Sequence, residues 1–510
     1  MSGFVCRYLK PVGFGTFCIF SFAGVAHAEL TAADVWADFK GYLTSSGYTI
    51  EAQESQSGNT LTISELNMAI PISEEEGDVD VVIGELSFTS NDDGSVSISI
   101  PQTLPMSMRV APPGEDTVSV NMEYTNTGLL MTATGEPNDL SYNYTASELL
   151  MRVNEIVVNG VGIDLGEIEV GMANLAGTTT MKVGEVRETE QQLVADAISY
   201  IFDITDPETG GRFNVQGAIN GLSGSGTSAL PPEVDATNMA LALENGFDIV
   251  AKLAFQSSSA NIEFEEEGET VKGETTSEMG TFDISMSADG IKYGATSAAT
   301  KVFMQGGEFP LPVEFAMGDA GFNITMPISS SDEEQDFAFG LKLADFTMSD
   351  LLWSLFDAGE QLPRDPATIA LNLSGTAKLL LNLLDAEEMA SMEQSGELPG
   401  ELNSLKVDGL QVSVAGAELM GEGAFTFNNE DLSTFSGFPA PDGAIDLSLV
   451  GGNGLLDKLV AMGLVPEEQA TGARLMLGLF TVPGTEADSL TSKIEVRPDG
   501  QVLANGQRLR

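Results

Sequence analysis

Apolar and polar residues alternate with a period of two along much of this chain, and this pattern predicts β-strands. The alternation is clear in Ser95 to Ile100, Thr117 to Tyr124, Thr281 to Met286 and Ala444 to Val450. Because one face of each strand is polar, antiparallel sheet is favoured over parallel sheet, which is usually covered on both sides. Dipeptides typical of hairpin turns lie between such strands, at Asp93-Gly94, Asn159-Gly160, Asn245-Gly246, Asp289-Gly290, Asp442-Gly443 and Asp499-Gly500.

Shorter segments between the strand blocks have the apolar spacing of amphipathic helices. Two of them contain the only tryptophans, Trp36 and Trp353, for which core packing is the better explanation than ligand binding. The predicted fold class is therefore mainly β (α+β): large curved antiparallel sheets or a sandwich, with a few amphipathic helices packed on them. The predicted helices are Thr31 to Thr44, Leu193 to Ile201, Leu351 to Phe356 after Ser349, Leu379 to Glu393, Leu455 to Met462 and Glu467 to Phe480.

One Gly/Ser-rich stretch that ends in two prolines, Gly217 to Pro232, predicts a flexible linker between two β-rich parts, 29–216 and 233–510. A weak internal repeat joins Asn67 to Ser90 with Asn323 to Ser349, since both contain Met, then Pro-Ile-Ser, an acidic turn and an apolar strand. Two duplicated halves would explain this repeat, and so would convergent turn chemistry.

Residues 1–28 have the pattern of an export signal. A short positive region precedes the uncharged stretch Pro11 to Val25, which is shorter than the roughly 20 residues that span a bilayer. The small residues Ala26 and Ala28 then predict cleavage just before Glu29. We expect a periplasmic protein, with secretion as the alternative, and no integral membrane segment after cleavage.

Cleavage changes the chemistry that remains. Cys6, Cys18 and His27 are the only cysteines and the only histidine, and all lie in the leader. Disulfides and histidine-dependent nucleophiles are thereby excluded from the mature chain, and zinc sites, which depend mainly on imidazole and thiolate, are disfavoured. Carboxylate, Ser-Lys and threonine chemistry and oxygen-ligated cations remain. We predict no catalytic, cofactor-binding or metal-binding residues, because even the acidic turn Thr89 to Ser95 lacks the spacing of a calcium loop.

The charge balance narrows the range of partners. The chain has 76 acidic and 22 basic residues and a net charge of −54. Nucleic acid is excluded as a partner, because its binding requires a basic surface. The acidic residues are scattered, which favours a solvated surface over a cation-binding site.

The segment from Phe309 to Asp385 resembles the bacterial secreted family called domain of unknown function 2125. The residues of this resemblance are the Pro-Ile-Ser-Ser-Ser-Asp turn, the helix with Trp353, and Leu362 to Ala367 followed by Gly375. The family implies no reaction. More distantly, the repetitive β-rich sequence is similar in build to AsmA-like envelope proteins, which implies long curved sheets and lipid handling.

Two classes of function follow. The first is an exported, non-enzymatic binding or scaffold protein of the cell envelope that holds lipid, another apolar ligand or an envelope protein. The 21 methionines suit an apolar lining, although they also suit an ordinary core. The alternative is a carboxylate-based hydrolase acting on envelope or extracellular polysaccharide.

Overall fold

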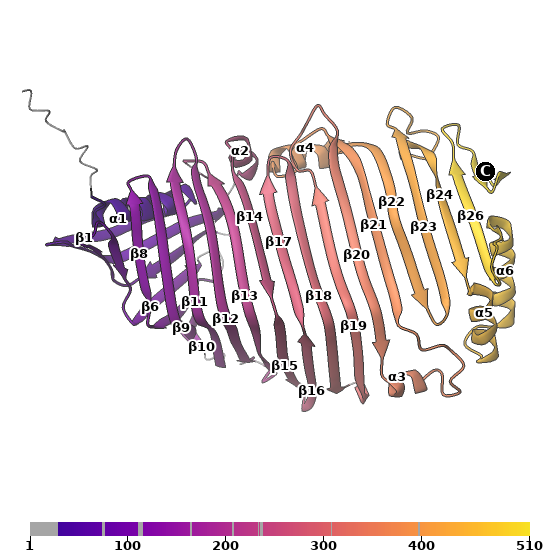
Figure 1. The fold of residues 1–510 in the computed structure, drawn as a ribbon, viewed down its shortest axis with the longest axis horizontal. Helices are drawn as coiled ribbons and strands as arrows, with labels where there is room; N and C mark the ends of the chain where they lie inside the picture. The colour runs from indigo at the N-terminus through magenta and orange to yellow at the C-terminus, as the bar shows by residue number, and fades with distance from the viewer. Residues whose placement is uncertain are drawn as a thin grey trace, which may run out of the picture.

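The computed structural model describes residues 29–510 except 74–76, 111–115, 164–165, 207–208, 233, 235–237, 308 and 396–397. Within this part of the chain, 28 strands belong to a single antiparallel sheet. The sheet runs from the N-terminal strands at one end of the molecule to the C-terminal strands at the other (Figure 1). The prediction of a mainly β fold with few helices is confirmed, as one sheet rather than two facing sheets.

The strands differ greatly in length, and the longest ones span the full width of the sheet. Their bounds are β1 Thr49–Ser57, β2 Thr60–Ser73, β3 Gly77–Ile83, β4 Leu86–Ser90, β5 Val96–Ser99, β6 Thr103–Val110, β7 Val118–Thr127, β8 Leu130–Glu136, β9 Asp139–Val158, β10 Val161–Ile163, β11 Gly166–Val183, β12 Arg187–Thr205, β13 Arg212–Leu230, β14 Asp248–Phe255, β15 Ser257–Glu266, β16 Glu269–Ser277, β17 Met279–Ser287, β18 Gly290–Gly306, β19 Phe309–Met326, β20 Gln335–Met348, β21 Ala367–Leu379, β22 Gly400–Val414, β23 Ala417–Asn428, β24 Ala440–Val450, β25 Val482–Pro483, β26 Ser489–Val496, β27 Val502–Ala504 and β28 Gln507–Arg508.

The helices lie at the ends and edges of the sheet. In Figure 1, α1 lies at the N-terminal end, α2 and α4 at the upper edge, α3 at the lower edge, and α5 and α6 beyond the last long strand. No helix of the described residues has the length and apolar content needed to cross a bilayer. Their bounds are α1 Ala32–Ser45, α2 Met239–Glu244, α3 Asp350–Ser354, α4 Ala386–Ser395, α5 Gly452–Ala461 and α6 Glu467–Phe480.

Short strands fill the width between long ones in pairs. One half of β13 pairs with β14 and the other half with β15. The pairing then continues from β14 to β17 and from β15 to β16. Strands β16 and β17 both pair with β18. The same arrangement links β2 to β9, through β4, β5 and β8 on one side and β3, β6 and β7 on the other.

Several long strands contain one residue with a left-handed backbone, at the level where the short strands end. These residues are Glu65, Asn174, Gly221, Ala299 and Asp345. A left-handed residue interrupts the pleat, so the alternation of side chains shifts by one position, as at a β-bulge. We call this series of interruptions the crease.

Strand β2 shows the effect of the crease directly. Leu61 and Ile63 precede Glu65, whereas Leu66 and Met68 follow it, and all four are buried in one core. Without the shift, two of these four side chains would point to the opposite face. The crease therefore keeps apolar residues on one face along the full length of the strand.

The helix predicted from Leu193 to Ile201 is wrong, because this segment lies within β12. Its apparent helical spacing has a simple cause. Leu193 and Ala195 lie on one side of the crease and Ile198 on the other, so the phase of the strand pattern changes between them.

The predicted linker from Gly217 to Pro232 is also wrong, because most of it belongs to β13. This strand pairs with β12 along its whole length and with β14 and β15 on its other side, so the sheet continues across the expected boundary. Small residues are needed here for packing. A Cβ at Gly217 would lie 2.3 Å from the Ser259 carbonyl oxygen and 2.5 Å from the Tyr200 hydroxyl oxygen.

Some of the predicted turns and helices are confirmed, and others differ from the structure. Four dipeptides lie in turns between strands, and the acidic turn Thr89 to Ser95 joins β4 to β5, as predicted. Asn245-Gly246 instead ends helix α2, and Asp442-Gly443 lies inside β24. The helices predicted at Thr31, Leu351, Leu455 and Glu467 are confirmed, whereas the segment from Leu379 becomes helical only at Ala386.

We predict that the backbone amides from Ala218 to Ser228 exchange slowly with deuterium, because they lie in a strand paired on both sides. Hydrogen-exchange mass spectrometry of peptides from this stretch and from β12 should give comparable protection. Immediate and complete exchange of the Gly/Ser stretch alone would restore the linker.

Candidate apolar binding surface

Residues paired across neighbouring strands share a face of the sheet, so the register identifies each face. On one face the paired residues are almost all apolar over many successive strands. One row across β17 to β22 consists of Ile284, Tyr293, Ile324, Phe339, Leu373 and Val407. A neighbouring row from β14 to β22 consists of Leu253, Phe282, Ala295, Phe322, Leu341, Leu371 and Leu410.

The apolar face continues on the other side of the crease. There the pairing joins the long strands through β15 and β16, and the apolar character of the row is the same. It consists of Val153, Ile168, Phe202, Val215, Ile262, Gly273, Met304 and Val313. These three rows, which contain no charged residue, define what we call the apolar face.

Neighbouring side chains of the apolar face contact one another laterally. The rings of Phe282, Tyr293, Phe322 and Phe339 form a series with centroid separations of 5.2, 5.9 and 5.6 Å. Aromatic pairs at such separations stabilise a sheet beyond the area that they bury. The side chains nevertheless stay only partly buried, and Leu253 remains 41% exposed.

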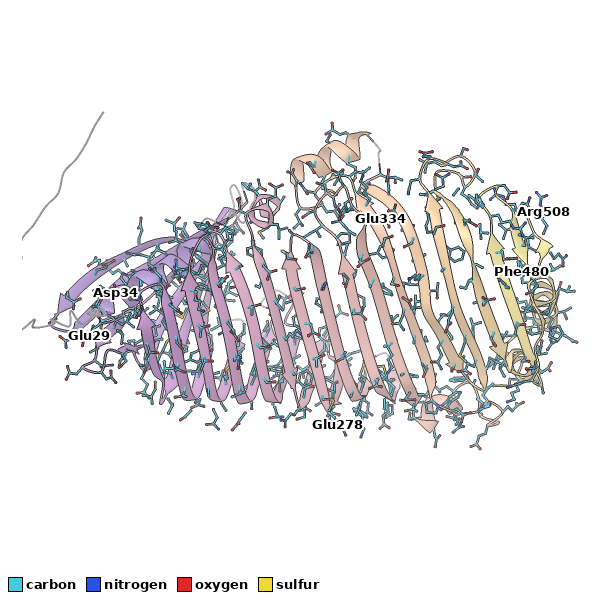
Figure 2. The ribbon with its side chains drawn as sticks, turned by 45° about the horizontal axis from the view of Figure 1, so that its top comes forward. Glu29, Asp34, Glu278, Glu334, Phe480 and Arg508 are labelled. Carbon is cyan, nitrogen blue, oxygen red and sulfur yellow. The ribbon has the colours of Figure 1, made fainter. Side chains whose placement is uncertain are left out.

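The total surface area is large for the mass of the chain. The chain exposes 29881 Å² for a mass of 53.7 kDa. A compact monomer of that mass would expose about 18,000 Å². A single sheet without a second layer has a large surface for its mass, and the strands form one layer along most of the molecule (Figure 2).

The opposite face is polar and acidic. Asp283, Asn323 and Asn372 lie on it in one row that also contains glycines. Their side chains project from the side of the sheet opposite to the aromatic series. Ion pairs join neighbouring strands there, and hydrogen bonds from Arg212 lower the pKa of Asp203. The cross-strand ion pairs are Arg152–Glu169, Arg212–Asp203, Lys272–Glu263 and Lys342–Asp319.

Hollows lie on this polar face. One of about 1060 Å³ at the upper edge is lined by serine, threonine and charged side chains, among them Lys292, Glu334 and Lys406. Another of about 680 Å³ is lined in equal parts by Ser, Thr, Asn and Gln and by apolar, aromatic and glycine residues, among them Leu130, Leu193 and Val194. Both hollows lie on the polar side of the sheet, so neither contributes to the rows that define the apolar face.

At the N-terminal end the sheet curls around α1 and covers it. The helix contacts β1, β2 and β4, and it also reaches Tyr142 of β9 and Arg187 of β12. Trp36 lies against Phe39 and Phe88 there, so its predicted role in core packing is confirmed. The buried core at this end consists of Leu30, Ala32, Val35, Trp36, Leu61, Ile63, Leu66, Met68, Leu86, Phe88, Val96, Ala133, Leu140, Tyr142 and Met181.

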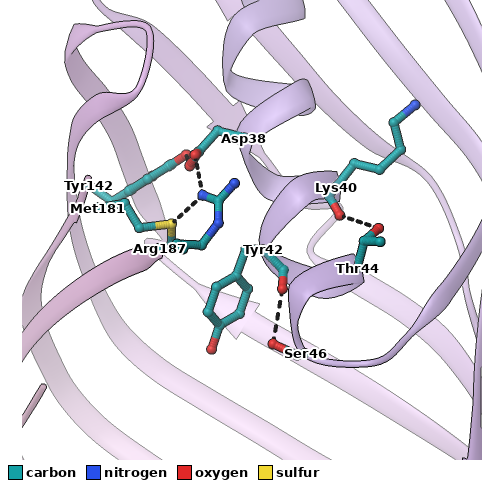
Figure 3. A network of polar contacts seen from close by, with 8 residues as sticks. All are labelled: Asp38, Lys40, Tyr42, Thr44, Ser46, Tyr142, Met181 and Arg187. Atoms are coloured by element: carbon teal, nitrogen blue, oxygen red, sulfur yellow. Dashed lines mark hydrogen bonds and ion pairs between the residues drawn. The ribbon is translucent and has the colours of Figure 1, made fainter. Parts of the chain in front are cut away.

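A buried polar network fixes α1 to the sheet (Figure 3). Asp38 accepts a hydrogen bond of 2.6 Å from the Tyr142 hydroxyl and a second one from the Arg187 guanidinium, which also reaches the sulfur of Met181. Gly41 leaves room for this guanidinium, because a Cβ there would lie 2.6 Å from its Nη2 atom. Burial and the Asp38 carboxylate raise the pKa of Tyr142, so the phenol stays protonated and keeps donating.

The structure offers little for the hydrolase alternative. Hydrogen bonds lower the pKa values of Glu54, Asp93 and Asp431, to about 2 for Asp431, whereas a general acid needs a raised pKa. Among the described residues, no three His, Cys, Asp or Glu side chains lie close enough to hold a metal ion. Of the predicted cleavage residues, Ala26 and Ala28 lie outside the described part, and Glu29 is exposed at its start.

Comparisons with known proteins give no further guide. No protein-family model, curated protein or solved structure matches the chain. The resemblance to the secreted family of unknown function therefore stays a prediction.

We predict that Arg187→Met lowers the free energy of unfolding by about 3–5 kcal/mol, because it leaves the Asp38 carboxylate buried without its cation. The double variant Arg187→Met, Asp38→Asn should lose less free energy of unfolding than Arg187→Met alone, because it leaves no buried charge unpaired. As a matched control, Arg152→Met removes a partly exposed ion pair and should cost about 0–1 kcal/mol. Urea unfolding followed by tryptophan fluorescence measures all three, and equal midpoints for Arg187→Met and Arg152→Met would contradict the role of the network.

Proposed function

We propose that this protein is an exported, non-enzymatic binding or scaffold protein of the cell envelope, and that its apolar face holds acyl chains of lipids. The observation that supports this most is the run of apolar rows from β9 to β22 without a covering layer. Soluble monomers rarely expose a continuous apolar surface of more than a few hundred Å². A surface of this extent needs an apolar occupant.

The chemistry of the face favours a flexible apolar chain as that occupant. The backbone hydrogen bonds of its strands are satisfied within the sheet, and its side chains are mostly aliphatic or aromatic. An occupant gains free energy from burial of apolar area, about 25 cal/mol per Å², and finds almost no partner for a polar group. Met304 and similar thioethers add an adaptable lining.

The polar face supports the same assignment, because its chemistry differs so clearly from that of the apolar face. Its acidic residues and ion pairs keep that side in water, so the two faces of the strands meet different surroundings. An envelope protein seated on the apolar face is the other partner consistent with this contrast. No geometry of the described residues favours the polysaccharide hydrolase over either.

We predict that purified protein binds a fluorescent fatty acid saturably, and that Phe322→Glu weakens this binding by about tenfold or more. Phe322 lies at the centre of the aromatic series, and a carboxylate there must be desolvated by the bound chain. The matched control is Asn323→Glu, which adds the same charge to the neighbouring residue on the polar face and should leave binding unchanged.

Circular dichroism must show that both variants remain folded. Binding that is absent from the wild type, or equal in the two variants, would contradict the assignment to the apolar face. Native mass spectrometry of protein isolated from the periplasm adds an independent test, since co-purifying lipid is expected.

We predict that the exported protein begins at Glu29. Intact-mass measurement of protein from the periplasmic fraction of an expressing cell should give the mass of Glu29 to Arg510. Ala28→Asp should slow cleavage and enrich the uncleaved form, because a small residue is needed at that position. A periplasmic form that still contains His27 would refute the predicted site.

A further inference from the structure

Helix α6 has apolar residues on both its inner and its outer side. Its inner side, with Ala470 fully buried, faces the molecule, and α6 contacts α5. A surface helix is expected to be polar on its outer side. In the second half of α6 the outer side is instead apolar: Leu475 is 69% exposed, Met476 54% and Leu479 52%.

The first residue of the next strand extends this surface. Val482 of β25 is 43% exposed and lies two residues after the end of α6. Charged residues of the helix lie elsewhere, since Glu467 and Glu468 are in its first turn and Arg474 is paired with Asp457 of α5. We call Leu475, Met476, Leu479 and Val482 the C-terminal patch.

The charge of the chain changes abruptly at this end. Residues 451–510 contain 7 acidic and 6 basic residues, a net charge of −1, whereas residues 29–450 contain 69 acidic and 14 basic residues, a net charge of −55. An anionic surface therefore repels the C-terminal end, where Phe480 and Arg508 lie in Figure 2, far less than it repels the rest of the chain taken as a whole.

We propose that the C-terminal patch is a docking surface for a phospholipid leaflet. A helix that lies in a membrane interface places its apolar side chains about 5–10 Å deep, among the headgroups and upper acyl chains. Leu475, Met476 and Leu479 lie on one side of α6 at spacings of one, three and four residues, as such insertion requires.

This docking deepens the proposed function and rests on it for the identity of the cargo. With α6 at the leaflet, the rest of the long sheet points away from the membrane. This part of the sheet is acidic, so the anionic headgroups repel it. A lipid that leaves the leaflet would then reach the apolar face, whose rows end at β22, across β23, β24 and β26. The patch itself contacts the leaflet and not the cargo.

The test is flotation of the mature protein with vesicles of phosphatidylethanolamine and a minority of phosphatidylglycerol. The triple variant Leu475→Ser, Met476→Ser, Leu479→Ser should reduce vesicle binding about tenfold or more, because it removes the inserted apolar area. Its affinity for the fluorescent fatty acid should match the wild type. Added salt should strengthen wild-type binding, since it screens the repulsion between the acidic part and the headgroups.

Two controls separate the possible failures. Leu130→Ser with Val194→Ser removes exposed apolar residues, 70% and 53% exposed, from the acidic part and should leave vesicle binding intact. Phe322→Glu should bind vesicles normally while losing the fatty acid, so failure of the cargo assignment is distinguishable from failure of docking. Wild-type protein that does not float with vesicles would overturn the docking proposal. So would a triple variant that floats normally, or one that only converts a dimer to a monomer in sedimentation velocity.

Discussion

The structure depends on one constraint: a single sheet satisfies its backbone laterally but gives its side chains no opposing layer. Each long strand pairs on both sides, so most of its backbone hydrogen bonds form within the sheet and need no second sheet. Side-chain stabilisation must then come from neighbours on the same face, as between Phe282, Tyr293 and Phe322. Such contacts bury only part of each ring, and the apolar area that remains determines what the protein can bind.

The N-terminal end shows how the same sheet behaves when it is covered. There α1 occupies the apolar side, and Ile63, Leu66 and Phe88 are almost completely buried. Asp38 and Arg187 link the helix to β12 through a buried ion pair. Loss of either partner would leave the other charge buried without a counter-charge, which destabilises the fold. The helix thus occupies, at one end, the position that bound chains would occupy along the rest of the sheet.

Local pattern predicted the strands and most of the helices, because period two and helical spacing depend only on neighbouring residues. It failed at Leu193 to Ile201, where the crease shifts the strand phase, and at Gly217, where a gap in the side-chain layer accepts Tyr200. Both features depend on adjacent strands. The apolar face was predictable strand by strand, but the lack of a second layer was not, since it follows from how all the strands are paired.

The two ends of the molecule differ in the feature that matters for a surface partner. The N-terminal end buries its helix through Trp36 and a polar network, whereas α6 leaves Leu475 and Leu479 in solvent. A chain with 76 acidic residues has enough polar side chains to cover its surface, so the exposure of these leucines is a local feature of α6. Residues 29–450 have a net charge of −55, whereas residues 451–510 have a net charge of −1 and keep apolar side chains outward. In the proposed docking, this difference in charge and hydrophobicity sets the orientation of the long sheet relative to the membrane surface.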